Sequence, residues 1–306
     1  MGVFILRRLL QSIPVLFFST FVVFLVIHLI PGDAAAVLAG PNASPEALTA
    51  VRHEMGLDQP LPVQYLRFLE RLAHGSLGTS IRTHRDVTVE ILDRLPYTLE
   101  LAFAAVLIST TLGVSLGVIA AVNRARAADL VTMGIAMVGL SVPTFFLALI
   151  GIVVFSLRLH WLPVTGAASL GSLVLPAVSL SLHSAAVKAR ITRSSMLEIL
   201  GQDYLRTARA KGLRERTVIW RHALKNALIP VTTIVGLQFG SLLGGAFIIE
   251  TIFGWPGVGL LSVQAIFNRD FPVIQGTVLL VAVAYLVTNL LVDLLYAWLD
   301  PRIRYA

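Results

Sequence analysis

The sequence predicts an all-α membrane protein with six transmembrane helices, because its composition is too apolar for a chain that is surrounded by water. Of the 306 residues, 56% are hydrophobic and only 13% are charged, against about 25% charged residues in an ordinary soluble domain. The mean hydropathy of +0.82 points the same way. Most of the chain is therefore expected to face lipid or other buried helices. The lack of cysteine excludes disulfides, thiolate metal sites and cysteine nucleophiles.

Six apolar runs are the candidate spans, since about 20 residues of helix cross the hydrocarbon layer. They cover residues 9–30, 97–121, 130–157, 170–187, 227–249 and 276–298. The first run is longer than the apolar core of a signal peptide, so it is predicted to be a retained span rather than a cleaved leader.

The distribution of Lys and Arg predicts that both termini lie in the cytoplasm. With the N-terminus inside, the predicted inner segments hold sixteen Lys and Arg, whereas the short outer loops hold only Arg158 and Arg269. Such an excess of positive charge is typical of cytoplasmic loops.

The fourth run is the most polar of the six. Pro176, Ser179 and His183 share one helical face, and polar side chains in a span suit a helix that lines a path or a partner subunit. These three residues are predicted to line a translocation path. The alternative is that the serine bonds to a carbonyl of its own helix and His183 pairs with a neighbouring subunit.

Residues 31–96, between the first two spans, are predicted to form a small folded cap on the outer side. Pro41, Pro45, Pro60, Pro62 and the run 75–80 (GSLGTS) punctuate it, and helical patterning covers about 45–55 and 64–72. The cap either covers helix ends or docks an external partner.

The sequence excludes most enzyme motifs. Residues 113–117 (GVSLG) match the G-x-S-x-G pattern of a hydrolase, but they lie within a continuous apolar run, where Gly113 and Gly117 are typical of close helix packing. An intramembrane protease that uses Ser115 and His183 is a minor alternative. No phosphate-binding loop can be written, because the three lysines are followed by Ala189, Gly212 and Asn226.

The segment 188–226 between the fourth and fifth spans is predicted to be a basic cytoplasmic helix-turn-helix. Apolar residues recur at helical spacing over 194–211 and again over 215–228, with Gly212 as a natural stop between them. One interpretation is a helix held at anionic lipid headgroups. The other is insertion into a groove of another protein, which the short side chains at its centre favour.

A glycine repeat marks the fifth span. Gly236, Gly240 and Gly244 recur every four residues, which indicates close helix packing, either within the chain or at a subunit seam.

Residues 203–213 (DYLRTARAKGL) and 221–230 (RHALKNALIP) closely resemble the coupling segment of the inner-membrane permeases of ABC peptide importers, the dipeptide, oligopeptide, nickel and glutathione group. Further stretches similar to that family lie at 29–33, 56–61, 75–80, 253–259, 291–296 and 300–304. One departure is that Arg206-Thr207-Ala208 stands where ABC importers in general have Glu-Ala-Ala, so a salt bridge ascribed to that Glu is not expected here.

The resemblance implies a single transmembrane domain over 1–306 with the ABC importer permease (MetI-like) fold, in the inner membrane of a prokaryote. It implies a non-enzymatic permease subunit that pairs with a second, homologous permease as a heterodimer. Two ATP-binding subunits would bind ATP and Mg, leaving this chain without a cofactor, and an extracytoplasmic binding protein would deliver the substrate. Lipid is the other expected partner, and nucleic acid is not.

The resemblance also places the contact with the ATPase on the segment around Gly212. The residues predicted to form it are Tyr204, Arg206, Thr207, Ala208, Gly212 and Leu213. The expected substrates are di- or oligopeptides, with nickel chelates and glutathione as alternatives. An ion-coupled secondary carrier is the competing class, although such proteins usually show internal repeats or broken half-helices around buried carboxylates.

Overall fold

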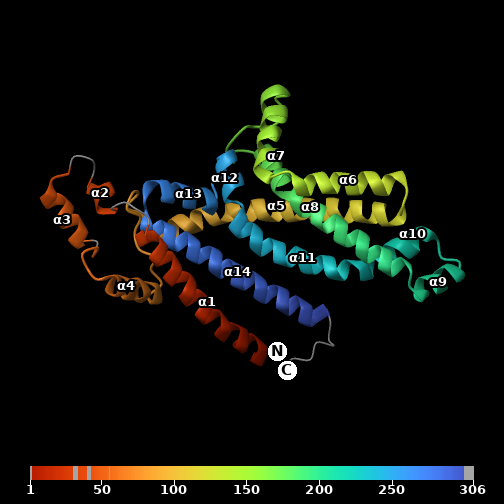
Figure 1. The fold of residues 1–306 in the computed structure, drawn as a ribbon, viewed down its shortest axis with the longest axis horizontal. Coiled ribbons are helices and arrows are strands. Elements are labelled where there is room, and N and C mark those ends of the chain that lie inside the picture. Colours follow the sequence, from red (N-terminus) through yellow and green to blue (C-terminus); the bar gives the residue numbers. More distant parts are fainter. Residues whose placement is uncertain (1, 30–33, 40–42, 55, 300–306) are drawn as a thin grey trace. The chain divides into compact units, whose positions relative to one another are not determined.

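A computed structural model describes residues 2–29, 34–39, 43–54 and 56–299 (Figure 1). Within these residues the regular secondary structure is helical, and one isolated β-bridge joins Thr79 and Asp86. The described residues form two compact units, one within 2–98 and 256–290 and the other within 99–255 and 291–299. Helices α5 (Val87–Val122) and α14 (Phe271–Leu299) contribute to both units.

The first unit contains the predicted outer cap. Besides parts of α5 and α14 it comprises α1 (Gly2–Leu29), α2 (Ala34–Ala39), α3 (Pro45–Glu54), α4 (Leu61–Ala73) and α13 (Val258–Asn268). Helices α3 and α4 confirm the two helical stretches that the sequence predicted in the cap, except for Met55, which lies outside the described residues.

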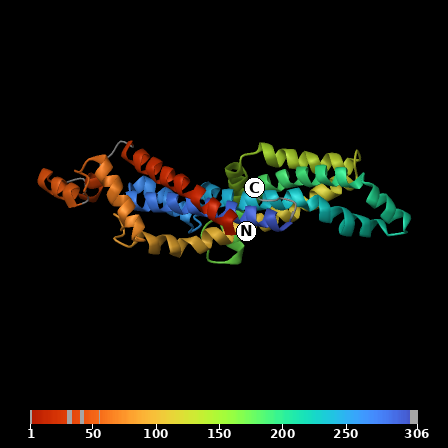
Figure 2. The same cartoon turned by 90° about the horizontal axis from the view of Figure 1, so that it is seen from below.

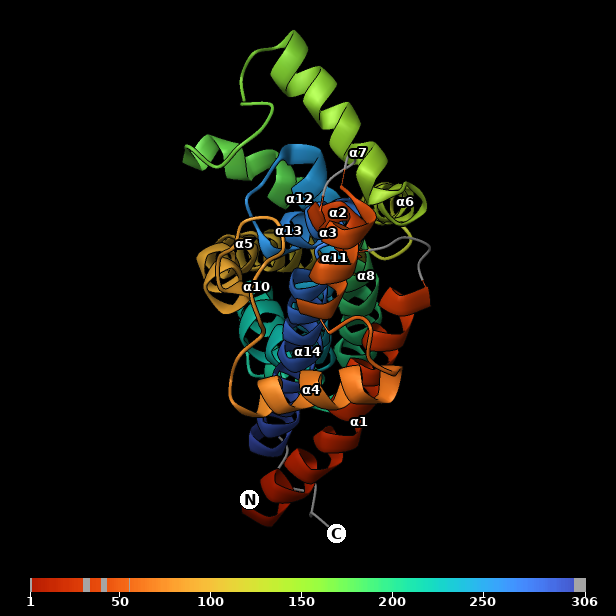
Figure 3. The ribbon, with the colours of Figure 1, turned by 90° about the vertical axis from the view of Figure 1, so that its left-hand side faces the viewer.

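Helix α4 packs across α1 through one aromatic cluster (Figure 3). Tyr65 is buried, with its ring centroid 5.9 Å from that of Phe17 and 5.2 Å from that of Phe24. Its hydroxyl lies 3.0 Å from Thr20 Oγ1, so the polar tip is satisfied inside the cluster. The cap is therefore a folded element and not a linker.

The second unit contains a helical hairpin that is joined to the end of α8. Besides parts of α5 and α14, the second unit comprises α6 (Ala127–Ser141), α7 (Thr144–Gly151), η1 (Ile152–Arg158), α8 (Leu170–Leu200), α9 (Asp203–Ala210), α10 (Glu215–Thr217), η2 (Val218–Ala223), α11 (Leu224–Gly245) and α12 (Phe247–Phe253). Helix α6 lies alongside α8 (Figures 1 and 2).

Helices α5 and α8 meet at the two glycines that the sequence singled out. A Cβ atom added at Gly113 would lie 2.6 Å from Cβ of Lys188, and one added at Gly117 would lie 2.5 Å from Cβ of Thr192. Only a hydrogen atom fits at either place. The prediction that these glycines form a packing face, and not a nucleophile elbow, is confirmed.

The apolar runs do not all become single straight helices. Among the described residues, α5, α8 and the part Phe271–Val292 of α14 are each long and apolar enough to cross a membrane. The third predicted run is instead bent by 101° between α6 and the segment formed by α7 and η1, and the fifth is bent by 60° between α11 and α12. The first bend follows from Pro143, which disfavours helical backbone at the preceding residue. Counting each bent pair as one span gives up to five, and Leu10–Leu25 of α1 is a shorter apolar helix.

Candidate functional site: a basic hairpin below helix α8

Helix α8 extends well beyond the predicted end of the fourth span. It continues to Leu200, stops at Gly201 and Gln202, and is followed by α9 from Asp203. The sequence predicted one helix over 194–211, which is wrong, because the chain turns at this break. We call α9, α10 and η2 the basic hairpin, residues 203–223.

Lys188, at the start of the predicted cytoplasmic segment, has a packing role that the sequence did not predict. Its side chain, which extends from α8, is fully buried. The Nζ atom donates a 2.6 Å hydrogen bond to Ser109 Oγ on α5, and Ser109 donates onward to the Val106 carbonyl at 3.0 Å. The alkyl part of Lys188 lies where Gly113 leaves room for it, so this lysine fastens α8 to α5.

The inner face of the basic hairpin packs on the chain itself. Leu205 and Ala208 are 0% and 9% exposed, and they belong to a cluster with Val118, Ala121, Met196, Val218, Ala223, Leu224 and Ala227. The methyl group of Ala208 therefore points into the protein's own core. The sequence-based expectation that this small side chain inserts into a groove of another protein does not agree with this position.

Two polar contacts hold the hairpin closed. Asn226 Nδ2 donates to the Tyr204 hydroxyl at 2.8 Å. The Arg209 guanidinium donates to both carboxylate oxygens of Glu215, at 3.0 and 2.9 Å. These hydrogen bonds raise the pKa of Arg209 above its usual value, so the pair keeps its charges. Tyr204 thus braces the hairpin and is also 42% exposed.

The outer face of the hairpin carries the exposed residues. Arg206 and Thr207 are both exposed, and Thr207 Oγ1 bonds within the helix to the Asp203 carbonyl at 3.2 Å. Gly212 ends α9 with a positive φ of 75°, and an added Cβ there would meet open space. Leu213 follows and is 40% exposed. Of the six residues predicted for the coupling contact, the structure brings five to the accessible side of the hairpin and leaves Ala208 inside.

An ion pair that the sequence did not predict ties α8 to the first turn of α6. Arg193 binds the Asp129 carboxylate with two hydrogen bonds, of 2.6 and 2.8 Å. Asp129 also accepts from the Ala125 backbone N–H at 3.0 Å, where Ala125 has a positive φ of 60°. The partners are 64 positions apart, so no local pattern could have revealed the pair.

The predicted path residues do not share one accessible surface. Pro176 and Ser179 are buried in α8, whereas His183 is exposed. Ser179 and His183 are four positions apart and therefore lie on one face of the helix. The rest of the protein covers this face at Pro176 and Ser179 but not at His183. Ser181, two positions after Ser179, donates to the carbonyl of Val178 at 2.8 Å, which is the kind of bond within the helix that was the alternative for Ser179.

The glycine stripe of the fifth span is partly explained. A Cβ added at Gly236 would overlap a methyl group of Val292 on α14, so the predicted close packing is confirmed there, within the chain. Gly240 is buried, and Gly244 lies among residues whose side-chain surroundings are not described.

Comparison with known proteins gives matches over nearly the whole chain. Residues 113–305 match the family described as "Binding-protein-dependent transport system inner membrane component", and residues 1–102 match its N-terminal part. The "Glutathione transport system permease protein GsiC" of Salmonella paratyphi A is 45% identical over 302 residues, 99% of each chain. Its counterpart in Escherichia coli K12 is 44% identical over the same length and coverage.

Solved structures agree on the fold. An inward-facing MetNI methionine ABC transporter is similar with a TM-score of 0.59 at 17% identity, covering 70% of this chain and 97% of that chain. An amino acid ABC transporter is similar with a TM-score of 0.52 at 19% identity, covering 71% and 95%.

Proposed function

Because this chain belongs to the family of inner-membrane components of binding-protein-dependent transport systems, we propose that it forms half of a peptide-importing pore with a second, homologous permease. Membership itself makes the chain a permease subunit of an ABC importer in the inner membrane, and not an enzyme. Such a permease works with ATPase subunits and a substrate-binding protein. The heterodimer, the substrate and the contact residues are the parts proposed here.

The proposed substrate class is short peptides, with glutathione as the first compound to test. The observation that carries this choice is the identity of 45% over 99% of both chains to permeases named for glutathione transport. Glutathione is a tripeptide, so it falls within the peptide class that the sequence motifs favour.

The proposed contact for the ATPase is the exposed face of the basic hairpin, around Arg206, Thr207 and Leu213. ATP and Mg would be bound by the partner subunits. A push on this face would reach α8 through the buried residues Leu205 and Ala208, because these pack against Met196 of α8. The Lys188 bond and the glycine contacts would then carry the displacement into α5.

Reconstitution with the second permease, the ATPase subunits and the binding protein tests this proposal. Labelled glutathione and a labelled dipeptide should enter proteoliposomes only with ATP and the binding protein. Uptake by this chain without an ATPase, driven by an ion gradient, would contradict the proposal and favour a secondary carrier.

The predicted orientation is tested in the same preparation, since the chain has no cysteine of its own. Ser80, the obvious outer position, is 1% exposed and unsuitable, whereas Thr79 and Ser194 are both exposed. Cysteines at these two positions should react with an impermeant reagent from opposite sides of the membrane. Reaction from the same side would exclude the orientation with both termini inside.

A further inference from the structure

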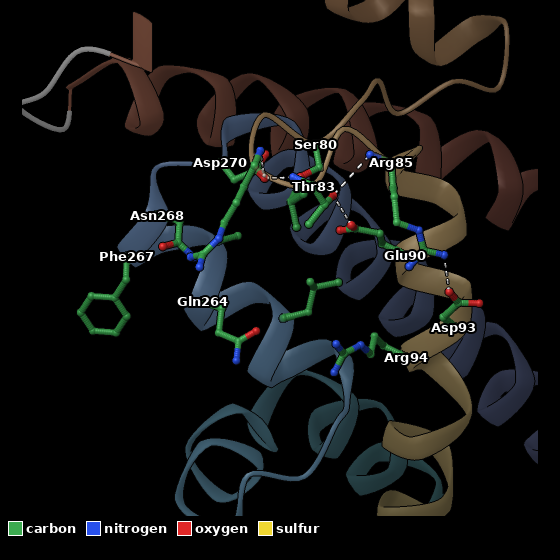
Figure 4. Close-up of a pocket in the computed structure, with 14 residues that line it drawn as sticks. Ser80, Thr83, Arg85, Glu90, Asp93, Arg94, Gln264, Phe267, Asn268 and Asp270 are labelled. Atoms are coloured by element: carbon green, nitrogen blue, oxygen red, sulfur yellow. Dashed lines mark hydrogen bonds and ion pairs between the residues drawn. The ribbon is translucent and has the colours of Figure 1, made fainter. Parts of the chain in front are cut away.

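The first unit contains a charged cavity of about 560 Å³ that the functions above do not use (Figure 4). The loop before α5, the first turns of α5 and the end of α13 line it, together with the start of α14. By the charge distribution, this end of α5 is on the predicted outer side of the membrane. The polar residues that matter are Arg82, Arg85, Glu90, Asp93, Arg94, Gln264, Asn268 and Asp270.

The three carboxylates of the cavity already have partners. Asp270 is 4% exposed and accepts hydrogen bonds from Ser80 Oγ at 2.5 Å and from the backbone N–H of Ile81 at 3.2 Å. Glu90 is 7% exposed and accepts from the Thr83 hydroxyl (Figure 4). Asp93 pairs with Arg85 at 2.8 Å. These acids therefore build the walls of the cavity.

Two cations of the cavity are not paired in this way. Among the described residues, the guanidinium groups of Arg82 and Arg94 have no carboxylate within ion-pair distance. Arg94 extends from α5 toward Gln264 of α13 (Figure 4). A guanidinium has five N–H donors in a planar fork that matches a carboxylate. The unused donors of the cavity thus outnumber its unused acceptors.

The rim of the cavity is apolar on the side of α13. Phe267 is 84% exposed and its ring points away from the other lining residues (Figure 4). An exposed aromatic ring beside arginines is typical of protein interfaces. A small ligand would instead be expected to be enclosed on most sides. The two arginines together with the exposed ring favour a protein partner, which would contact the arginines and also cover the rim.

We propose that this cavity receives an acidic side chain of the extracytoplasmic binding protein, with Arg82 and Arg94 binding its carboxylate and Phe267 covered at the rim. The inference rests on the proposed function and adds the chemistry of the docking contact. The amides of Gln264 and Asn268 would supply further donors to the same carboxylate.

The experiment measures the affinity of the purified binding protein for the whole transporter complex in nanodiscs at low and high salt. The double variant Arg82→Gln, Arg94→Gln should bind about tenfold more weakly and lose most of the salt dependence, because the charged pair speeds association and fixes the register. The matched control is Arg158→Gln, which removes one exposed arginine at the other predicted outer loop and should bind normally. Phe267→Ser should also weaken binding, with unchanged salt dependence.

A second measurement covers the case in which the double variant assembles poorly. Gln264→Cys, in a chain without other cysteines, should cross-link to the binding protein, and Arg158→Cys should not. Equal affinity of parental and double-variant complexes, or absence of the cross-link, would overturn this inference but would leave the proposed function standing. So would binding of free glutathione to the complex that is lost in the double variant, because the cavity would then hold a small ligand. Failure of the parental complex to capture any binding protein would overturn the proposed function as well.

Discussion

The seam between α5 and α8 and the basic hairpin both contain small residues at a close contact, yet they use them in different ways. In the seam, Gly113 and Gly117 let α5 approach the backbone and side chains of α8 so closely that a Cβ atom would not fit at either glycine. In the hairpin, Ala208 is small because it fills the chain's own core, while Thr207 beside it is exposed. The seam thus has no room for a Cβ atom at either glycine, whereas one face of the hairpin is exposed. A small residue in a helix indicates that another segment packs closely against it, but only the structure shows which segment that is.

Basic residues divide in the same manner along one stretch of chain. Lys188 and Arg193 are used inside the protein, by Ser109 and Asp129 respectively. Arg206 stands exposed, with only a 3.6 Å contact to Asp203 on its own helix. The first two anchor α8, and the third is free to meet a partner. The number of Lys and Arg residues in this segment therefore overestimates the positive charge that is available to bind anionic lipid headgroups.

The seam gives the largest expected effect on folding. Gly117→Ala would place its Cβ 2.6 Å from the Ala189 carbonyl oxygen and 2.5 Å from Thr192 Cβ, which forces α5 and α8 apart and should cost on the order of 3 kcal/mol. Thermal unfolding of the purified complex measures the loss. Gly134→Ala on α6, where the added atom meets open space, is the matched control and should be neutral or stabilising. Equal melting of the two variants would contradict the closed seam.

The inner face of the hairpin comes next. Ala208→Trp overfills the cluster with Leu205 and Met196 and should lower the stability of the hairpin by about 1–3 kcal/mol. Hydrogen exchange of the α9 amides follows this change directly. The control is Ala210→Trp, two positions away on the exposed side, which should exchange like the parent. Protection that is the same in both variants would place Ala208 outside the core.

The sequence predicted what depends on local pattern and missed what depends on distant partners. Composition and apolar runs predicted the helical membrane fold, and the spacing of Gly113 and Gly117 predicted their packing face. Proline at 143 could have indicated the break in the third run, but a 101° bend needs the packing of α7 to define it.

The candidate site was only partly predictable for the same reason. Gly212 was identified as a helix stop from its residue type, and the positive φ confirms it. The buried side of α9 was misjudged, because helical periodicity gives two faces without saying which one the protein covers. The pairs of Lys188 with Ser109 and of Arg193 with Asp129 join residues 79 and 64 positions apart, beyond the reach of any local signal.

The brace across the hairpin should give a smaller effect. Tyr204→Phe removes the hydroxyl that accepts from Asn226 at 2.8 Å and donates to the His222 carbonyl at 3.4 Å. The loss should cost about 0.5–1.5 kcal/mol, because the second bond is long and most of the effect comes from the first. Hydrogen exchange in α9 should rise correspondingly, with the ring still in place. Asn226→Ala should give the same change, and the double variant should add little to either. Strictly additive effects would show that the two side chains act separately.

The open face should give the smallest effect on folding and the most specific effect on transport. Thr207→Trp loses only a bond within its own helix, so stability should change by about 0.5 kcal/mol or less. A tryptophan on this face would nevertheless fill the space that the proposed ATPase contact needs, and uptake per ATP hydrolysed should fall about tenfold, the equivalent of roughly 1.4 kcal/mol at the interface. If the face rests on lipid headgroups instead, tryptophan is favoured there, and both uptake and hydrolysis should stay at parental values. The two interpretations of the basic hairpin thus make opposite predictions for a variant that folds normally in either case, which Ala208→Trp could not achieve because it damages the core first.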